Sequence, residues 1–93
     1  MKKMICHFKV KEVLGVSEDA ASVLRIIEEV ADMALIHRDA LFTETTHKAA
    51  KARALIFYRI RKETSVTFAE IAKMFSVTPG NVANMIKAHH DAT

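Results

Sequence analysis

Residues 67–85 read TFAEIAKMFSVTPGNVANM and carry the start signals of two short helices. Thr67 and Glu70 have the spacing of a capping box, in which each side chain satisfies a backbone group at the helix start. Pro79 disfavours helical geometry at Thr78, so the first helix must end by Val77. Thr78 can then cap a second helix that begins at Pro79. The stretch predicts a helix-turn-helix over residues 67–88.

Apolar residues at helical spacing mark the inner faces of both helices. The predicted inner face of the first helix consists of Phe68, Ile71, Ala72 and Phe75, with the small Ala72 where the two helices cross. The predicted inner face of the second helix consists of Val82, Met85 and Ile86. The residues left facing outward from the second helix are Gly80, Asn81, Ala83, Asn84 and Lys87.

Length and composition indicate one small globular domain. The chain has 93 residues, 51% of them hydrophobic, with two Gly and one Pro, which suits an all-α protein and argues against disorder. The single cysteine, Cys6, cannot form an internal disulfide, and no apolar run approaches the roughly 20 residues that span a bilayer. We therefore expect a soluble cytoplasmic protein without a membrane partner.

Charge is distributed unevenly along the chain. Residues 1–46 carry six Lys and Arg against eight acids, whereas residues 47–93 carry eight against three, a net charge of +5. The basic excess lies in the half that contains the predicted helix-turn-helix, where a surface that binds a polyanion would need it. An ordinary solvated face is the other reading of the same excess.

The rest of the chain predicts further helices. Ser17 can cap an amphipathic helix that reaches Ala34 and has an acidic outer face, and a turn with one short helix follows over residues 35–42. Residues 43–47 read TETTH and predict a loop, and a long helix is expected from about Lys48 to Glu63. Residues 1–16 predict either a short helix or an extended arm ending at Gly15, packed on its own domain or on a second copy. With residues 17–93 as one helical domain, the fold is an all-α bundle of about five to six helices.

The helix-turn-helix stretch resembles the promoter-reading motif of sigma factors and related bacterial regulators. The resemblance rests on Thr67, on Glu70-Ile71-Ala72, on Val77-Thr78-Pro79-Gly80 and on a following valine, Val82. It implies that the second helix enters the major groove of DNA.

A wider resemblance, from about Val23 to Ile86, is to the C-terminal DNA-binding domain of the bacterial replication initiator DnaA. The residues that carry it are Ile27, Val30, Ala31, Asp39, Leu41, Ala52, Arg53, Phe68, Glu70, Ile71 and Phe75. It implies a Trp-repressor-like helical fold, a phosphate-contacting role for Arg53, and Arg61 in place of a family lysine.

The chain also departs from that family. The family's basic loop is replaced by Thr43-Glu44-Thr45-Thr46-His47-Lys48, which has one acid and one lysine. Its signature before the recognition helix is replaced by Val77-Thr78-Pro79-Gly80-Asn81, and no P-loop is present, so we expect no nucleotide site.

Two function classes follow from these features. The first is a small DNA-binding regulator of transcription or replication that binds double-stranded DNA. Its expected base contacts are Gly80, Asn81, Ala83 and Asn84. Its expected phosphate contacts are Lys48, Lys51, Arg53, Arg61, Thr67, Lys73, Thr78 and Lys87. The alternative is a protein-protein interaction module that kept the fold without strong DNA binding.

Catalysis, metals and cofactors have no support in the sequence. Cys6-His7 and His89-His90 are adjacent pairs without the spacing of zinc ligands, and no acid-base constellation is evident. We therefore expect no enzyme activity, no metal and no cofactor. A homodimer is possible, because one recognition helix reads few base pairs and such proteins commonly pair half-sites.

Overall fold

Side-chain caps set the starts of several helices in the computed structural model, which describes residues 5–92. Ser17 accepts a hydrogen bond from the backbone N–H of Ala20 at 3.1 Å, and helix α2 (Glu18–Ala34) follows. Thr46 accepts one from Ala49 at 3.2 Å at the start of α4 (His47–Glu63). The predicted capping box opens α5 (Phe68–Phe75), with Thr67 and Glu70 each bonded to the other's backbone N–H. These starts confirm the predictions made from Ser17 and Thr67.

The last helix begins where Pro79 requires it. Helix α6 (Pro79–Ala92) follows a three-residue turn, and the Thr78 hydroxyl accepts a hydrogen bond from the backbone N–H of Asn81 at 3.1 Å. Ser76 ends α5 in the left-handed region, at a φ of 58°, which turns the chain sharply toward α6. The two helices and their short turn therefore lie where the sequence predicted them.

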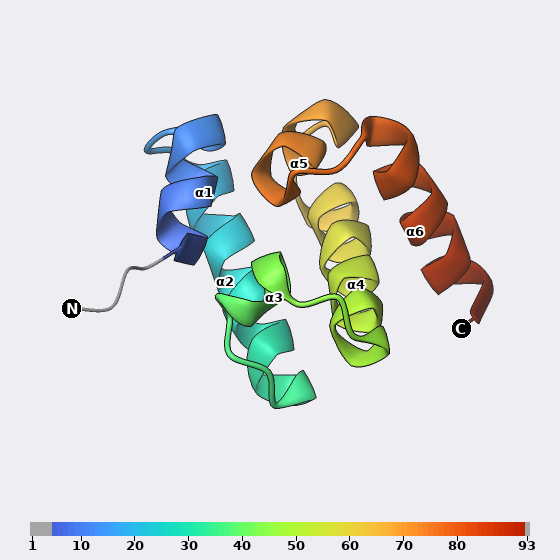
Figure 1. The fold of residues 1–93 in the computed structure, drawn as a ribbon. Helices are drawn as coiled ribbons and strands as arrows, with labels where there is room; N and C mark the ends of the chain where they lie inside the picture. Colours follow the sequence, from blue (N-terminus) through green and yellow to red (C-terminus); the bar gives the residue numbers. More distant parts are fainter. Residues whose placement is uncertain (1–4, 93) are drawn as a thin grey trace.

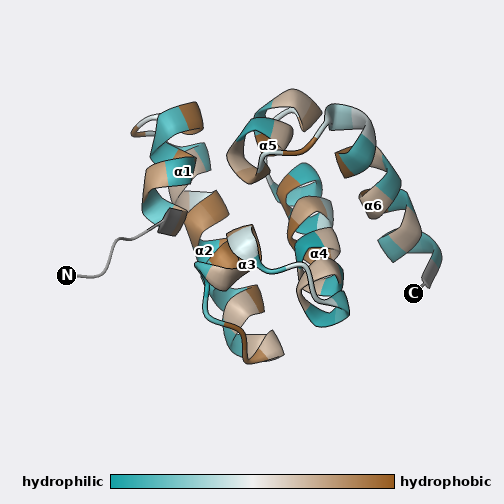
Figure 2. Cartoon of the chain, viewed as in Figure 1, coloured by the Kyte–Doolittle hydropathy of each residue, from teal (hydrophilic) through white to brown (hydrophobic). Residues whose placement is uncertain are grey.

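Six helices and no strand make up the described part of the chain, in agreement with the all-α prediction. Helix α4 lies in the middle and contacts α2, α6 and the short α3 (Ala40–Thr43), while α5 contacts α6 and the first helix, α1 (Ile5–Leu14) (Figure 1). The radius of gyration is 12.1 Å, close to the roughly 12 Å expected of a compact domain of this length. In Figure 2 the long helices carry both hydrophobic and hydrophilic residues, as packing on a shared core requires.

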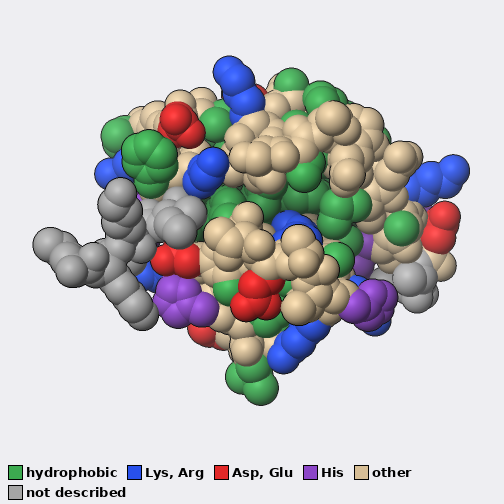
Figure 3. Space-filling view, in the orientation of Figure 1, with side chains coloured by type: hydrophobic (Ala, Val, Ile, Leu, Met, Phe, Trp, Pro, Cys, Tyr) green, Lys and Arg blue, Asp and Glu red, His purple; other side chains and the backbone are tan. Residues whose placement is uncertain are grey.

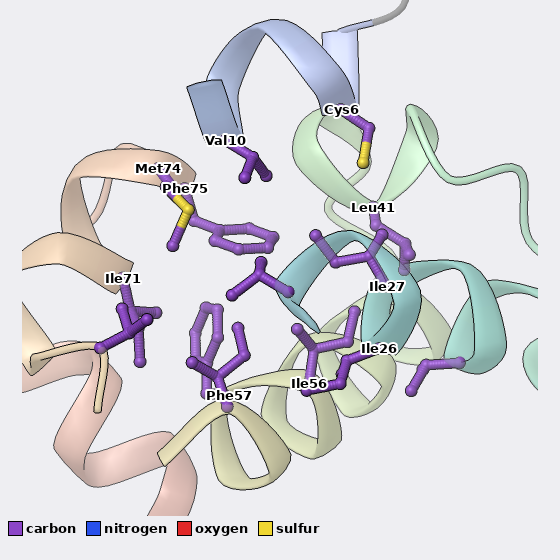
Figure 4. Packing of buried hydrophobic residues seen from close by; sticks show 14 of the residues in the cluster. Cys6, Val10, Ile26, Ile27, Leu41, Ile56, Phe57, Ile71, Met74 and Phe75 are labelled. Atoms are coloured by element: carbon purple, nitrogen blue, oxygen red, sulfur yellow. The ribbon is translucent and has the colours of Figure 1, made fainter. Parts of the chain in front are cut away.

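Aromatic rings occupy the centre of the core. The rings of Phe57 in α4 and Phe75 in α5 pack edge to face, with their centroids 4.9 Å apart. The ring of Phe42 in α3 stacks on Phe75 at a centroid distance of 4.4 Å. Figure 4 shows Phe57 and Phe75 surrounded by aliphatic side chains from α1, α2 and α4. Edge-to-face and offset aromatic pairs add to the stabilisation that burial alone provides.

The N-terminal segment is a helix that packs on its own domain. Cys6 and Val10 of α1 are fully buried in the same core cluster as the other helices (Figure 4). Asp39 accepts a hydrogen bond from the Cys6 backbone N–H at 3.1 Å and so caps the first turn of α1. Burial raises the pKa of the Cys6 thiol to about 12, so this cysteine is a packed side chain and an unreactive one. Residues 1–4 of the predicted arm lie outside the described residues.

One expectation about buried residues was wrong. Phe68, expected on the inner face of α5, is 39% exposed, because it lies at the first position of the helix and covers the guanidinium of Arg61. On α2, Ile26 is fully buried beside Val23 and Ile27.

Ion pairs fasten the acidic side of α2 to α4. Arg59 contacts Glu29 at 2.9 Å and Glu63 at 2.8 Å, and Arg25 contacts the same two carboxylates from α2. The hydrogen bonds from Arg59 hold the pKa values of Glu29 and Glu63 below their usual value of 4.5. Among the described helices, none combines the length and apolar character that crossing a bilayer requires.

Candidate nucleic-acid interface

Helix α6 turns polar residues outward, as predicted. Gly80, Asn81, Asn84 and Lys87 are exposed, while Val82 is fully buried. Met85 and Ile86 are half-buried against the core, as their predicted inner position requires. The expectation fails only at Ala83, which is half-buried at the edge of the packed face. A Cβ added at Gly80 would meet no atom within 4 Å, so the backbone there is open to a large partner.

Both outward asparagines have exposed side chains that form no hydrogen bond with another described residue. The backbone N–H of Asn81 donates to Thr78 in the first turn, where the chain is held by the cap. Asn84 lies one turn further along, and no hydrogen bond joins its side chain to another described residue. An Asn side chain has both a donor and an acceptor, so Asn84 can form a paired hydrogen bond with a base edge.

Four lysines on the predicted list are available to a polyanion. Lys48 and Lys51 on α4, Lys73 on α5 and Lys87 on α6 are all exposed. No ion pair joins any of them to an acid within residues 5–92. On the face drawn in Figure 3, Lys and Arg side chains are spread over the surface and do not form one continuous patch.

Most of the predicted phosphate contacts lie at the two ends of α4, on α5 and on α6. Lys48 and Lys51 lie in the first turns of α4, whereas Arg61 lies in its last turn, about 20 Å further along the helix axis. Thr67 and Lys73 belong to α5, which follows the C-terminal end of α4. Lys87 lies on α6, between the outward asparagines and the C-terminus.

Arg53 is engaged inside the fold. Its Nη1 donates to the carbonyl oxygens of Leu41 at 3.0 Å and Glu44 at 2.7 Å, which closes the C-terminal end of α3 onto α4. No ion pair joins Arg53 to Asp39, Glu63 or Glu70 among the described residues. The structure therefore gives Arg53 a fold-stabilising role, and its phosphate contact stays a prediction.

Arg61 is exposed but also has internal partners. Its Nη1 donates to the carbonyl of Val66 at 2.6 Å, and its guanidinium lies 4.6 Å from the centre of the Phe68 ring. A cation over an aromatic face is stabilised by the ring's negative centre. These contacts hold the positive charge of Arg61 beside the start of α5.

The hydroxyls of Thr67 and Thr78 are both used as helix caps. A phosphate contact by either residue would have to share an oxygen that already accepts a backbone hydrogen bond. The hydroxyl proton of Thr78 is still able to donate, whereas Thr67 already donates toward Glu70 at 3.2 Å.

One positively charged side chain near the turn between α5 and α6 was not predicted from the sequence. Lys9 of α1 donates to the Ser76 hydroxyl at 3.4 Å, which brings a positive charge from residue 9 to the turn between α5 and α6. No local pattern could have shown this, because it depends on how α1 packs against α5.

No family model, curated protein or solved structure matches this chain. The resemblance to the DnaA domain and to sigma-factor motifs therefore remains a prediction carried by the residues themselves. The described residues also contain no group of three or more His, Cys, Asp or Glu side chains arranged to hold a metal ion.

Proposed function

We propose that this chain is a small DNA-binding protein of helix-turn-helix type, with a Trp-repressor-like or DnaA-like arrangement of its helices. In this proposal α6 enters the major groove, with Asn81 and Asn84 at base edges and the exposed lysines at phosphates. The observation that carries the proposal is the outward face of α6. This face is polar and exposed, and α6 follows a capped three-residue turn after α5, whose apolar face is buried.

Salt dependence tests the proposal directly. A protein that neutralises phosphates releases counterions, so its affinity for DNA falls linearly in log salt. We expect the full chain to bind a fluorescein-labelled duplex of mixed sequence, as measured by anisotropy from low to physiological salt. Replacing Lys73 or Lys87 with Ala should each reduce the slope by about 1.

A matched control lies on α2, which provides none of the proposed DNA contacts. Arg25 is exposed on the acidic face of α2, so Arg25→Gln removes one positive charge away from the proposed interface. The slope of log DNA affinity against log salt for Arg25→Gln should equal that of the unmodified chain. Binding that does not change with salt, or equal slopes for all four proteins, would instead support the alternative of a protein-protein interaction module.

A further inference from the structure

An apolar groove of about 680 Å³ lies between α2, α4 and α6. The C-terminal end of α2, the N-terminal half of α4 and the C-terminal half of α6 form its walls. The apolar side chains that matter most for its shape are Met33, Ala50, Ala54, Leu55, Met85 and Ala88. A groove of this size, lined mainly by apolar groups with a few polar ones, is typical of a binding site.

Alanine side chains on α4 and α6 leave open space in the groove between these helices. Ala50 and Ala54 lie one turn apart on α4, and Ala88 faces the same space from α6. Such residues allow another helix to approach within normal packing distance.

Two large apolar side chains are exposed near the C-terminal end of α2. Met33, on the groove wall, is 69% exposed, and Leu35, just beyond it, is 86% exposed. Leu35 also has a φ of 57°, a left-handed conformation in which glycine or asparagine is usual. Met33 therefore gives the groove wall a large exposed apolar side chain that a partner could cover.

The polar residues that line the groove are all basic. They are His47, Lys48 and Lys51 on α4 and His89 on α6, and no acid lies among the lining residues. Neither lysine has an ion pair within residues 5–92. The N-terminal end of the α4 dipole adds to the positive potential at this end of the groove.

We infer that this groove binds an amphipathic helix of a partner protein, with apolar residues on one face and acidic residues beside them. Such a helix presents three to four apolar side chains per two turns, which suits a groove of this form. Its acids would pair with Lys48 and Lys51. A second copy of this chain fits less well, because the apolar faces of its helices are in the core and Glu28 and Glu29 already contact Arg38 and Arg59.

This inference goes beyond DNA binding and does not depend on it. The groove uses Met85, Ala88 and His89 of α6, whereas the proposed DNA contacts are Asn81, Asn84 and Lys87. Only Lys48 and Lys51 belong to both sets.

A peptide selection tests the inference on the full chain without DNA. The library consists of helical peptides with Leu at positions i, i+3, i+4 and i+7 and with Glu, Gln or Lys at the flanking positions. We expect enrichment of the Glu-flanked peptides. In methyl NMR, a synthetic peptide of a selected sequence should shift the methyl signals of Met33 and Met85. The signal of the fully buried Met74 should not change.

Two pairs of variants separate the apolar and the charged contributions. Ala88→Glu should lower the affinity for the Glu-flanked peptide about tenfold, because the substitution places a carboxylate in the apolar groove. Ala21→Glu, at an exposed alanine of α2 outside the groove, should have no effect. Lys51→Glu should lower the affinity for the Glu-flanked peptide about fivefold and raise the affinity for the Lys-flanked peptide. Lys73→Glu, on α5, should change neither affinity.

Several results would overturn the inference. These are a selection that yields no binder, equal enrichment of the three flank types, or a bound peptide that leaves Met33 and Met85 unchanged. Sedimentation showing that the free chain pairs with itself, with the same two methyl signals shifted by dilution, would assign the groove to a second copy. If circular dichroism shows that Ala88→Glu is unfolded, the charge reversal at the exposed Lys51 still tests whether the groove binds an acidic helix.

Discussion

Arg53 joins two elements with one side chain. Its guanidinium donates to the carbonyls of Leu41 and Glu44 across the end of α3. We expect Arg53→Ala to lower the free energy of unfolding by about 2 kcal/mol, because charged hydrogen bonds are lost and two carbonyls lose their donor. Urea denaturation at neutral pH measures this change.

The control for this variant is Lys51→Ala, at an exposed residue of the same helix. It should leave the free energy of unfolding nearly unchanged. An Arg53→Ala protein with full stability and a DNA salt slope lowered by about 1 would contradict the structural role and restore the phosphate contact.

The exposed side chain of Asn84 is open to a base edge. It is exposed on α6 one turn after the cap, and a bidentate contact from Asn to adenine contributes about 1–3 kcal/mol of discrimination. We expect Asn84→Ala to leave folding and non-specific DNA binding nearly intact and to flatten an adenine preference at one position. Selection from a random duplex library, run in parallel for both proteins, measures this preference. Identical selected sequences would show that Asn84 does not read bases.

At the scale of elements, Arg59 couples α2 to α4. Its hydrogen bonds hold the pKa values of Glu29 and Glu63 below 4.5 in the folded chain. The unfolded chain therefore takes up protons first as the pH falls, so the stabilisation is present above 4.5 and is lost as the pH falls through the lowered values. Arg59→Gln should be less stable at neutral pH and should lose less stability than the unmodified chain below pH 4.5.

Urea denaturation across a pH series measures this coupling. Lys51→Gln removes a positive charge from the same helix without breaking an ion pair among the described residues, so its pH profile should follow that of the unmodified chain. Parallel profiles for Arg59→Gln and the unmodified chain would show that the ion pairs at Glu29 and Glu63 do not contribute to stability.

The elements that could be predicted from sequence are those with local signals. Ser17, Thr67 and Pro79 act within a few residues of their own positions, so the starts of α2, α5 and α6 follow from short stretches. The inward position of Val82 follows from helical spacing alone. The outward exposure of Asn81, Asn84 and Lys87 could be predicted for the same reason.

The features that could not be predicted depend on contacts between distant segments. The acceptors of Arg53 lie nine and twelve residues away on another element, so no periodic pattern reveals them. Helix α1 buries Cys6 and Val10 by packing on other helices, and its remaining apolar residues follow no single period. The groove is equally hidden, because its lining comes from α2, α4 and α6 together.

At the scale of the whole molecule, α1 belongs to the core. Val10 is fully buried against the other helices, so Val10→Ala should lower the free energy of unfolding by about 2 kcal/mol through lost burial and a new cavity. Thermal or urea denaturation measures the loss. Lys11→Ala, at the exposed neighbouring position, is the matched control. Equal stability of the Val10 and Lys11 variants would show that α1 does not contribute to the core in solution.

A homodimer remains a prediction, based on the short reading length of one recognition helix. Paired helix-turn-helix units contact half-sites about 34 Å apart, one turn of DNA. We expect sedimentation at micromolar concentration to show dimers of the full chain. Because α1 is part of the core, deleting residues 1–15 would test folding and not association, so the measurement requires the intact chain. A monomer at every concentration would contradict the prediction.

The contact between α1 and the α5–α6 turn also has a consequence during synthesis on the ribosome. Lys9 and Ser76 are separated by 67 residues, so the N-terminal helix cannot reach its final place until α5 has been translated. At typical elongation rates that interval is roughly 3 to 13 s. During it, Val10 has no α5 to cover it, and a nascent chain stalled before α5 would expose this apolar side chain to chaperones.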